Sequence, residues 1–159
     1  MLKCLIGYTG FVGYNLCKSV SFDYYFNSKN ISNLSQYEFD LIVCSAAPGS
    51  MIRANNNEKD DFKNIESLLG ILLKSKTKKI VLISTIGVFN SFSDKNNENS
   101  SRYETQLGYG KNRRFFESAL VNSGIRTHII RLPSLFGYNL KKNFLFDIIN
   151  PSPSFLPSK

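Results

Sequence analysis

The sequence predicts an α/β protein with a doubly wound parallel sheet, and three observations support this fold class. Short apolar runs alternate with amphipathic segments along the chain, as strands and helices do in parallel α/β sheets. A glycine-rich turn lies directly between the first apolar run and the first amphipathic segment. At 159 residues and 42% hydrophobic composition, the chain has the size and apolar content of one globular domain.

The apolar runs are expected to form five strands, at residues 2–6, 24–26, 40–45, 79–85 and 127–131. The amphipathic segments are expected to form helices at residues 11–20, from about residue 57 to residue 73, and at residues 108–122. Gly124 follows the last helix and is suited to cap it. Residues 30–36 and 90–101 are polar and are expected to be loops.

Composition narrows the class of protein. No run approaches the roughly 18 apolar residues that cross a bilayer, and no signal peptide is recognised, so we expect a cytoplasmic protein without a membrane partner. Cys4, Cys17 and Cys44 lack metal-ligand spacing and are expected to be free thiols in buried elements, with no metal bound. The net charge of +8 is scattered along the chain, which favours an anionic small substrate such as a nucleotide over a nucleic acid.

The glycine turn Gly7-x-x-Gly10-x-x-Gly13 follows a strand and begins a helix, the context in which this pattern binds a dinucleotide diphosphate. The first glycine permits the tight turn, the second lets the backbone approach the diphosphate, and the third lets the helix pack on the strand. The intervening Thr9, Phe11 and Val12 are expected to line the same site. The cofactor is therefore expected to be NAD or NADP.

The residues after the second strand bear on the choice between these cofactors. An acidic residue there would bind the ribose hydroxyls of NAD. The chain instead has Asn27, Ser28 and Lys29. Ser28 and Lys29 could receive the 2′-phosphate of NADP, and a solvated turn is an equal alternative.

Taken in order, short motifs along residues 2–137 resemble those of the extended short-chain dehydrogenase/reductases, the NAD-dependent epimerase/dehydratase group that acts on nucleotide sugars. The motifs are Gly-Tyr-Thr-Gly-Phe-Val-Gly at 7–13, Ser45-Ala46-Ala47, Asn64-Ile65, Leu82-Ile83-Ser84-Thr85 with Val88-Phe89, Tyr109-Gly110-Lys111-Asn112-Arg113, and Arg131-Leu132-Pro133-Ser134-Leu135-Phe136-Gly137. The resemblance implies a Rossmann fold. It also implies cofactor contacts from Ser45, Ala46, Ala47, Ser84, Tyr109, Arg113, Pro133 and Leu135.

The same resemblance implies catalytic roles. Tyr109 would be the acid/base, Thr85 would hydrogen-bond the substrate oxygen, and Asn64 would brace the site. The family has a lysine four residues after the tyrosine, on the same helix face, to activate the hydroxyl and hold the nicotinamide ribose. This chain has Arg113 at that position, which is cationic but longer and forked. Lys111 points elsewhere around the helix and cannot replace it.

The resemblance implies an oxidoreductase, epimerase or dehydratase of a nucleotide-linked sugar, in polysaccharide biosynthesis, with Thr85, Ser134 and Asn143 toward the substrate. Residues 1–138 would form the NAD(P)-binding domain, and residues 139–159 the start of a truncated or minimal substrate-binding region, or an irregular tail. The alternative is a non-catalytic dinucleotide-binding sensor or scaffold, which Arg113 and the short length favour. The apolar faces at Phe62 and Phe115-Phe116 could form a homodimer interface, and packing in the core explains them equally well.

Overall fold

The computed structural model describes residues 1–91 and 97–140. Its elements follow the alternation of strands and helices that the apolar pattern predicts. In chain order they are β1 (Lys3–Ile6), α1 (Phe11–Ser19), β2 (Tyr24–Phe26), the 3-10 helix η1 (Ile31–Gln36), β3 (Glu38–Phe39), β4 (Leu41–Cys44), α2 (Met51–Asn56), α3 (Glu58–Leu73), β5 (Lys76–Thr77), β6 (Lys79–Thr85), the 3-10 helix η2 (Ile86–Val88), α4 (Gly108–Val121) and β7 (Arg126–Leu132).

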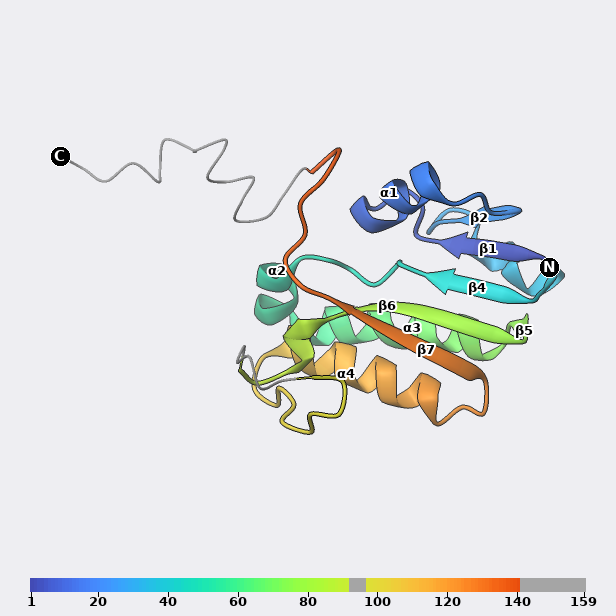
Figure 1. Cartoon of the computed structure of the whole chain (residues 1–159). Helices are drawn as coiled ribbons and strands as arrows, with labels where there is room; N and C mark the ends of the chain where they lie inside the picture. The colour runs from blue at the N-terminus through green and yellow to red at the C-terminus, as the bar shows by residue number, and fades with distance from the viewer. Residues whose placement is uncertain (92–96, 141–159) are drawn as a thin grey trace.

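Five strands form one sheet in the order β2-β1-β4-β6-β7 (Figure 1). Each neighbouring pair in this sheet is parallel, as the sequence predicts. From β1 the chain first adds β2 at one side of the sheet, and then returns to add β4, β6 and β7 in turn at the other side. The carboxyl ends of β1 and β4 therefore meet where the direction of building reverses, the place where open α/β sheets bind ligands.

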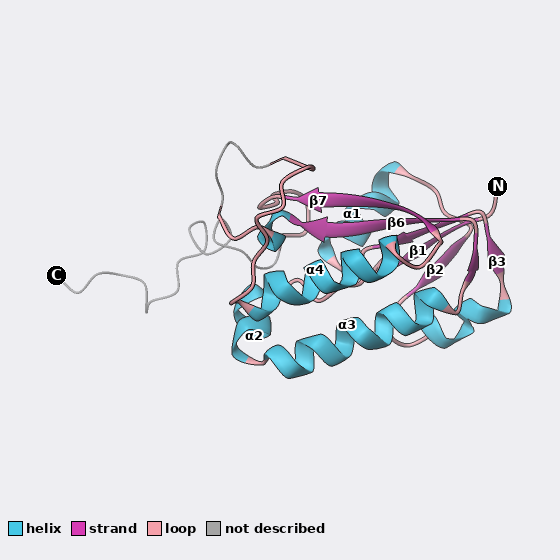
Figure 2. Cartoon of the chain, turned by 90° about the horizontal axis from the view of Figure 1, so that it is seen from below, coloured by secondary structure: helices cyan, strands magenta, loops and turns pink. Residues whose placement is uncertain are grey.

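Helices flank both faces of the sheet, which confirms the doubly wound class. α1 lies on one face, while α3 and α4 pack side by side on the other (Figure 2). On the face of the sheet that carries α1, the side chains become more exposed to solvent from β1 toward β7. Leu5 of β1 is fully buried there, whereas Ile130 of β7 is 44% exposed.

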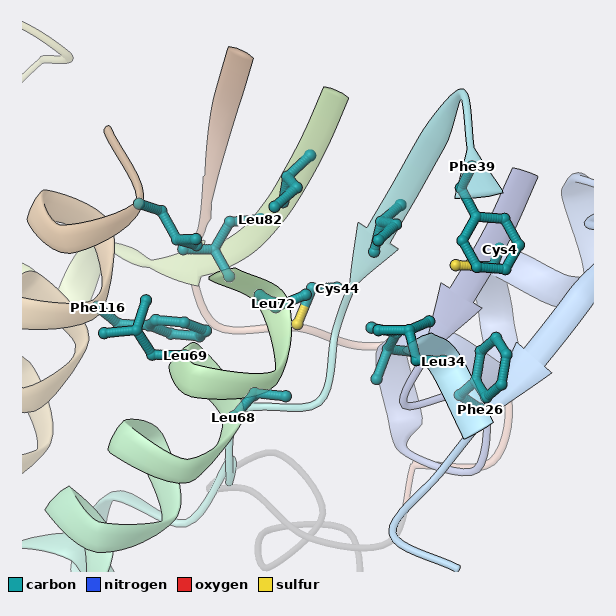
Figure 3. Close-up of a cluster of buried hydrophobic side chains, with 14 of the residues drawn as sticks. Cys4, Phe26, Leu34, Phe39, Cys44, Leu68, Leu69, Leu72, Leu82 and Phe116 are labelled. Atoms are coloured by element: carbon teal, nitrogen blue, oxygen red, sulfur yellow. The ribbon is translucent and has the colours of Figure 1, made fainter. Parts of the chain in front are cut away.

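The main core fills the space between the sheet and the layer of α3, α4 and η1 (Figure 3). Alternate residues of each strand point toward it, because successive side chains of a strand face opposite sides. Cys4 and Cys44 lie within this core as free thiols, as expected, and Cys17 is half-buried. Burial raises the pKa of the Cys4 thiol to about 12 and that of Cys44 to about 11.

Some elements differ from the sequence-based expectation. Residues 31–36 form η1 rather than an irregular loop, and β3 and β5 pair as a separate two-stranded sheet. α2 was not expected, because its exposed Met51 and Ile52 show no buried stripe; Ser50 caps it by accepting a hydrogen bond from the Arg53 amide at 3.3 Å.

The remaining expectations concern the end of α4, membrane-spanning segments, metal sites and the C-terminal tail. The sequence predicted Gly124 as the cap of α4, but α4 is capped at Asn122; Gly124 lies further along the chain, in the turn before β7, with a φ of 82°. Among the described residues, no helix has the length and apolar content to span a bilayer. The same residues hold no cluster of His, Cys, Asp and Glu suited to a metal. The tail at residues 141–159, including Asn143, lies outside the described part of the chain.

Candidate functional site

The glycine turn joins β1 to α1 at the carboxyl edge of the sheet. Gly7 has a φ of 90°, and a Cβ there would lie 2.7 Å from the carbonyl carbon of Ser45. A Cβ at Gly13 would lie 2.2 Å from the carbonyl oxygen of Gly7. At Gly10 an added Cβ meets only that same oxygen, at 3.4 Å, so the exposed Gly10 backbone faces open space. The three glycines thus occupy the three positions that the motif predicts.

The first turn of α1 provides the electrostatics that an anion requires. No side chain caps the helix at Gly10. The first amide groups of an α-helix, here those of Phe11, Val12 and Gly13, have no carbonyl partner within the helix. These amides and the helix dipole favour a negative group at this end. The turn therefore fits the diphosphate of a dinucleotide, and Thr9 lies exposed beside it.

β4 pairs with β1, and the residues that follow β4 lie beside the glycine turn. Ser45 follows β4, and its hydroxyl donates a hydrogen bond to the carbonyl oxygen of Ile6 at 3.0 Å. Ala46 and Ala47 come next and are half-buried. The cofactor contacts that the resemblance implies for these three residues stay a prediction.

The end of β2 forms a fixed polar turn beside the glycine turn. The Asn27 side chain donates to the Tyr8 hydroxyl at 3.1 Å and accepts from the Lys29 amide at 2.9 Å. Ser28 and Lys29 are exposed, and no carboxylate is present in residues 26–30. The turn thus presents a hydroxyl and an ammonium group where an NAD-specific site would place an acid.

Tyr109 and Thr85 come together around Gly87, at the same edge of the sheet. A Cβ built on Gly87 would lie 3.2 Å from the Tyr109 ring and 3.3 Å from the Thr85 hydroxyl oxygen. Thr85 ends β6, and its oxygen accepts a hydrogen bond from the Gly87 amide at 3.0 Å. Tyr109 lies in the first turn of α4, where its amide donates to the Asn55 side chain at 2.9 Å. The two hydroxyl-bearing residues that the sequence pairs are therefore neighbours.

Close packing of η2 on α4 holds this arrangement. A Cβ on Gly110 would lie 2.1 Å from the Gly87 carbonyl oxygen. Only glycine after Tyr109 allows the helix to approach η2 so closely. The position of the Tyr109 ring thus depends on the absence of a side chain at its neighbour.

Arg113 lies one turn after Tyr109 and is buried, with its guanidinium carbon 4.4 Å from the centroid of the Tyr109 ring. Its guanidinium donates to both oxygens of Asp61, one of them at 3.0 Å, and to the carbonyl oxygen of Pro48. The Asp61 and Arg113 side chains are only 5% and 3% exposed. Arg113 therefore faces Tyr109, as the helical spacing predicts, but its charge is paired with a carboxylate.

Lys111 points away from Tyr109, which confirms that it cannot take the place of Arg113. Its ammonium group lies 2.5 Å from the carboxylate of Glu58, at the start of α3. The side chain is partly exposed. Lys111 and Arg113 are thus both paired with acids of α3.

Asp61 is a site residue that the sequence did not single out. Asn64, which the resemblance places as a brace, is exposed one turn further along α3. Both border a hollow of about 370 Å³ beside α2, which is lined by Pro48, Ser50, Arg53, Ala54, Asn57, Asp60, Asp61 and Asn64. A signal for Asp61 was available, since it lies four residues before Ile65 on the buried stripe of α3.

Ser84, an expected cofactor contact, points into a buried ionic network instead of the sheet edge. Its hydroxyl donates to Glu117 at 2.6 Å. Glu117 is fully buried and also accepts from Arg131 at 2.7 and 2.9 Å. The hydrogen bond to Glu117 raises the pKa of Arg131. This network ties α4 to β6 and β7 beneath the candidate site.

The chain after β7 turns back toward α1. Pro133 and Ser134 are exposed in this segment and Leu135 is half-buried. The Tyr138 carbonyl oxygen accepts from the Asn15 side chain of α1 at 3.1 Å, and the Tyr138 ring stacks with that of Tyr14. The segment therefore reaches the helix that begins at the glycine turn.

No protein-family model matches the chain, and no curated protein matches it in sequence. Its fold, however, matches solved structures of dTDP-4-dehydrorhamnose reductases and UDP-sugar 4-epimerases, which share 15–20% identity with the chain. The resemblance that the motifs predict is thus confirmed for the fold.

Several of the solved structures with this fold are dTDP-4-dehydrorhamnose reductases. That of Clostridium acetobutylicum has a TM-score of 0.74 and 18% identity, over 94% of this chain and 59% of that one. That of Bacillus anthracis, in complex with NADP, has a TM-score of 0.74 and 20% identity, over the same shares. The UDP-glucuronic acid 4-epimerase of Bacillus cereus, in complex with NAD, has a TM-score of 0.63 and 19% identity, over 86% and 58%. The chain thus spans less than two thirds of these proteins.

Proposed function

We propose that the protein binds NAD or NADP and uses it to reduce, epimerise or dehydrate a nucleotide-linked sugar. One observation carries this proposal: Tyr109 and Thr85 surround Gly87 at the sheet edge that also holds the phosphate-binding glycine turn. A protein that only bound a dinucleotide would need the turn but neither hydroxyl. The dinucleotide-bound structures of this fold support the choice of cofactor.

The dinucleotide would lie across the carboxyl ends of β1 and β4. Its diphosphate would rest on the amides that follow Gly10, and Ala46 and Ala47 would border it. When bound, the dinucleotide supplies or accepts a hydride at a carbon of the sugar.

Tyr109 and Thr85 would handle the proton that accompanies the hydride. The Thr85 oxygen already accepts from the Gly87 amide, which leaves its hydroxyl hydrogen free to donate to a substrate oxygen. Tyr109 would exchange a proton with that same oxygen. Arg113 would hold the Tyr109 ring from one face through the contact at 4.4 Å.

Binding and turnover can be measured separately. Isothermal calorimetry with the oxidised and reduced forms of NAD and NADP tests the cofactor site. Nucleotide-linked 4-keto sugars with NADH or NADPH then test turnover, followed by the absorbance of the reduced nicotinamide. Tyr109→Phe should abolish turnover and preserve dinucleotide binding, while the control Tyr37→Phe, in the aromatic cluster of β2 and β3, should change neither. Absence of binding by all four dinucleotides would overturn the proposal.

A second candidate function is a dinucleotide-binding module without catalysis. The pairing of Arg113 with Asp61 favours it, because the guanidinium already donates to Asp61 and to the Pro48 carbonyl oxygen, so its charge is met within the protein. This candidate predicts saturable dinucleotide binding with no turnover of any sugar in the panel. It also predicts that Tyr109→Phe has no effect that depends on substrate.

A further inference from the structure

The loop that follows β7 starts at the end of the sheet where Thr85 lies. Leu132, the last residue of β7, is the register partner of Thr85, the last residue of β6. From there residues 133–138, which we call the post-β7 loop, follow the carboxyl edge of the sheet to α1 (Figure 1). Most of this loop is exposed, including Phe136 at 82% and Tyr138 at 73%. The loop therefore crosses the edge of the sheet without being buried in the core.

The far end of the post-β7 loop rests on the beginning of α1. The Asn15 side chain donates to the Tyr138 carbonyl oxygen at 3.1 Å and to the Phe11 carbonyl oxygen at 2.9 Å. A Cβ built on Gly137 would lie 3.5 Å from the Phe11 ring. The amide of Phe11 is one of those that suit a diphosphate, so this end of the loop lies beside the anion site.

Three side chains add to this contact between the loop and α1. The Tyr138 ring stacks with the Tyr14 ring, with centroids 6.2 Å apart and planes at 13°. The ammonium group of Lys18 lies 5.3 Å from the centroid of the Tyr14 ring and 5.9 Å from that of Tyr138. Paired rings attract each other, and a cation over a ring face adds to the attraction. Together with Asn15, these side chains form what we call the latch.

The latch is of a kind that opens readily. Its hydrogen bond from Asn15 to Tyr138 lies at the surface, where water competes for both partners. Segments with little buried apolar surface open locally far more often than core elements do. Opening of the latch would free the end of the loop at Tyr138, while Leu132 remains paired in the sheet. The carboxyl edge between β7 and α1 would then be accessible.

We propose that the post-β7 loop is a gate over the dinucleotide site and that the latch holds it closed. This inference rests on the proposed function, in which the dinucleotide extends from the amides after Gly10 toward Thr85. The two ends of the loop lie beside these same two places. A bound dinucleotide would lie between the loop and the edge of the sheet, and would enter and leave while the latch is open.

A gate of this kind changes rates and leaves affinity alone. A latch that does not touch the dinucleotide closes equally well over the empty site and over the occupied site. Weakening the latch then raises the open fraction in both states by the same factor. The association and dissociation rate constants rise together, and their ratio, the dissociation constant, stays the same.

Two substitutions each remove one part of the latch. Asn15→Ala removes the hydrogen bond, and Tyr138→Ala removes the ring contacts. Each should raise both rate constants roughly three- to tenfold, the effect of losing one modest contact. Stopped-flow fluorescence of NADH or NADPH gives the association rate constant, and displacement by excess oxidised dinucleotide gives the dissociation rate constant. The matched control Tyr138→Phe keeps the ring and should change neither.

Proteolysis tests the latch without any dinucleotide. Chymotrypsin cleaves after aromatic residues, and the bond after Phe136 lies within the post-β7 loop. When a segment opens and closes rapidly, the rate of cleavage follows its open fraction. Asn15→Ala should therefore be cut after Phe136 roughly three- to tenfold faster than the intact protein or Tyr138→Phe. Mass spectrometry identifies the cleaved bond, and circular dichroism confirms that each variant is folded.

The outcomes separate this inference from the proposed function. Equal acceleration of association and dissociation, with an unchanged dissociation constant, supports the gate. Unchanged rate constants in the folded Asn15→Ala and Tyr138→Ala variants would overturn it. Faster dissociation alone would also overturn it, because the latch would then be part of the binding surface. Failure of every dinucleotide to bind would overturn the proposed function and the gate with it, whereas unchanged rates with intact binding overturn only the gate.

Discussion

Gly13 packs directly against Gly7, such that a Cβ at Gly13 would lie 2.2 Å from the Gly7 carbonyl oxygen. The same Cβ would lie 2.7 Å from the Cα of Tyr8. Both contacts are to backbone, which cannot rotate away as a flexible side chain can. The first helix can therefore reach the end of β1, and present its free amides there, only because position 13 has no side chain.

This contact predicts a large effect of Gly13→Ala. The methyl group must push α1 away from the turn, so we expect the free energy of unfolding to fall by about 1–3 kcal/mol. Dinucleotide binding should be lost as well. Urea unfolding and calorimetry measure the two effects.

Gly70→Ala is the matched control. Gly70 also lies within a helix, and nothing lies within 4 Å of a Cβ built there. The added methyl group should raise the free energy of unfolding by about 0.4–1 kcal/mol and leave binding unchanged. Equal effects of the two substitutions would contradict the packing argument.

The turn after β2 predicts a preference for NADP. Ser28 and Lys29 offer donors to a 2′-phosphate, whereas Asn27 already bonds to Tyr8 and to the Lys29 amide. A hydrogen bond to a charged group is worth about 1.5–3 kcal/mol, so Lys29→Glu should weaken binding of NADP roughly tenfold or more. Calorimetry with NADP and NAD gives the comparison.

The control for this prediction is Lys63→Glu, which makes the same charge change at an exposed position of α3. It should alter the affinity for either dinucleotide little, because the charge lies on another element. Equal affinity of the intact protein for NAD and NADP, unaffected by Lys29→Glu, would show that the turn does not read the 2′ position.

The three thiols should differ in reactivity. Burial raises the pKa of Cys4 to about 12 and that of Cys44 to about 11, so neither forms the reactive thiolate near neutral pH. Cys17 is only half-buried. With an aromatic disulfide reagent at about pH 8, Cys17 should react first, and Cys4 and Cys44 only as the protein unfolds. Cys17→Ser should remove the early phase, and simultaneous reaction of all thiols would contradict the burial.

The contacts of Asp40 lead us to predict that the free energy of unfolding falls at acidic pH. Its carboxylate accepts from Lys78 at 2.6 Å and from the Leu2 amide at 2.7 Å, and these bonds, that to Lys78 first, lower the pKa of Asp40. A pKa that is lower in the folded state gives stability above the ordinary pKa of aspartate, about 3.9, which is lost as the pH falls through the folded value.

Urea unfolding as a function of pH tests this relationship. The difference in unfolding free energy between the intact protein and Asp40→Asn should be greatest near neutral pH and should shrink below about pH 4. A difference that stays constant between neutral and acidic pH would exclude the ionised Asp40 as its source.

The local pattern of apolar residues and glycines was sufficient to predict the main strands and helices. β2 and β6 have the bounds that the apolar runs predict, and the glycine turn has the backbone that its spacing requires. The neighbourhood of Tyr109 and Thr85 was also predictable, although through the family resemblance and not through spacing. α2 and the short pair β3–β5 were missed, because two-residue strands and a helix with exposed apolar residues leave no periodic pattern.

The sequence by itself therefore determined the alternation of strands and helices, the backbone of the glycine turn and the identity of the cation beside Tyr109, since these depend on neighbours within a few residues. Only the tertiary structure decided that the charge of Arg113 is met by Asp61, which is 52 positions away in the chain. It also turned Ser84 toward Glu117, 33 positions away, and left Asn64 exposed. Pairing of charges depends on which helices pack face to face, and no local pattern specifies that contact.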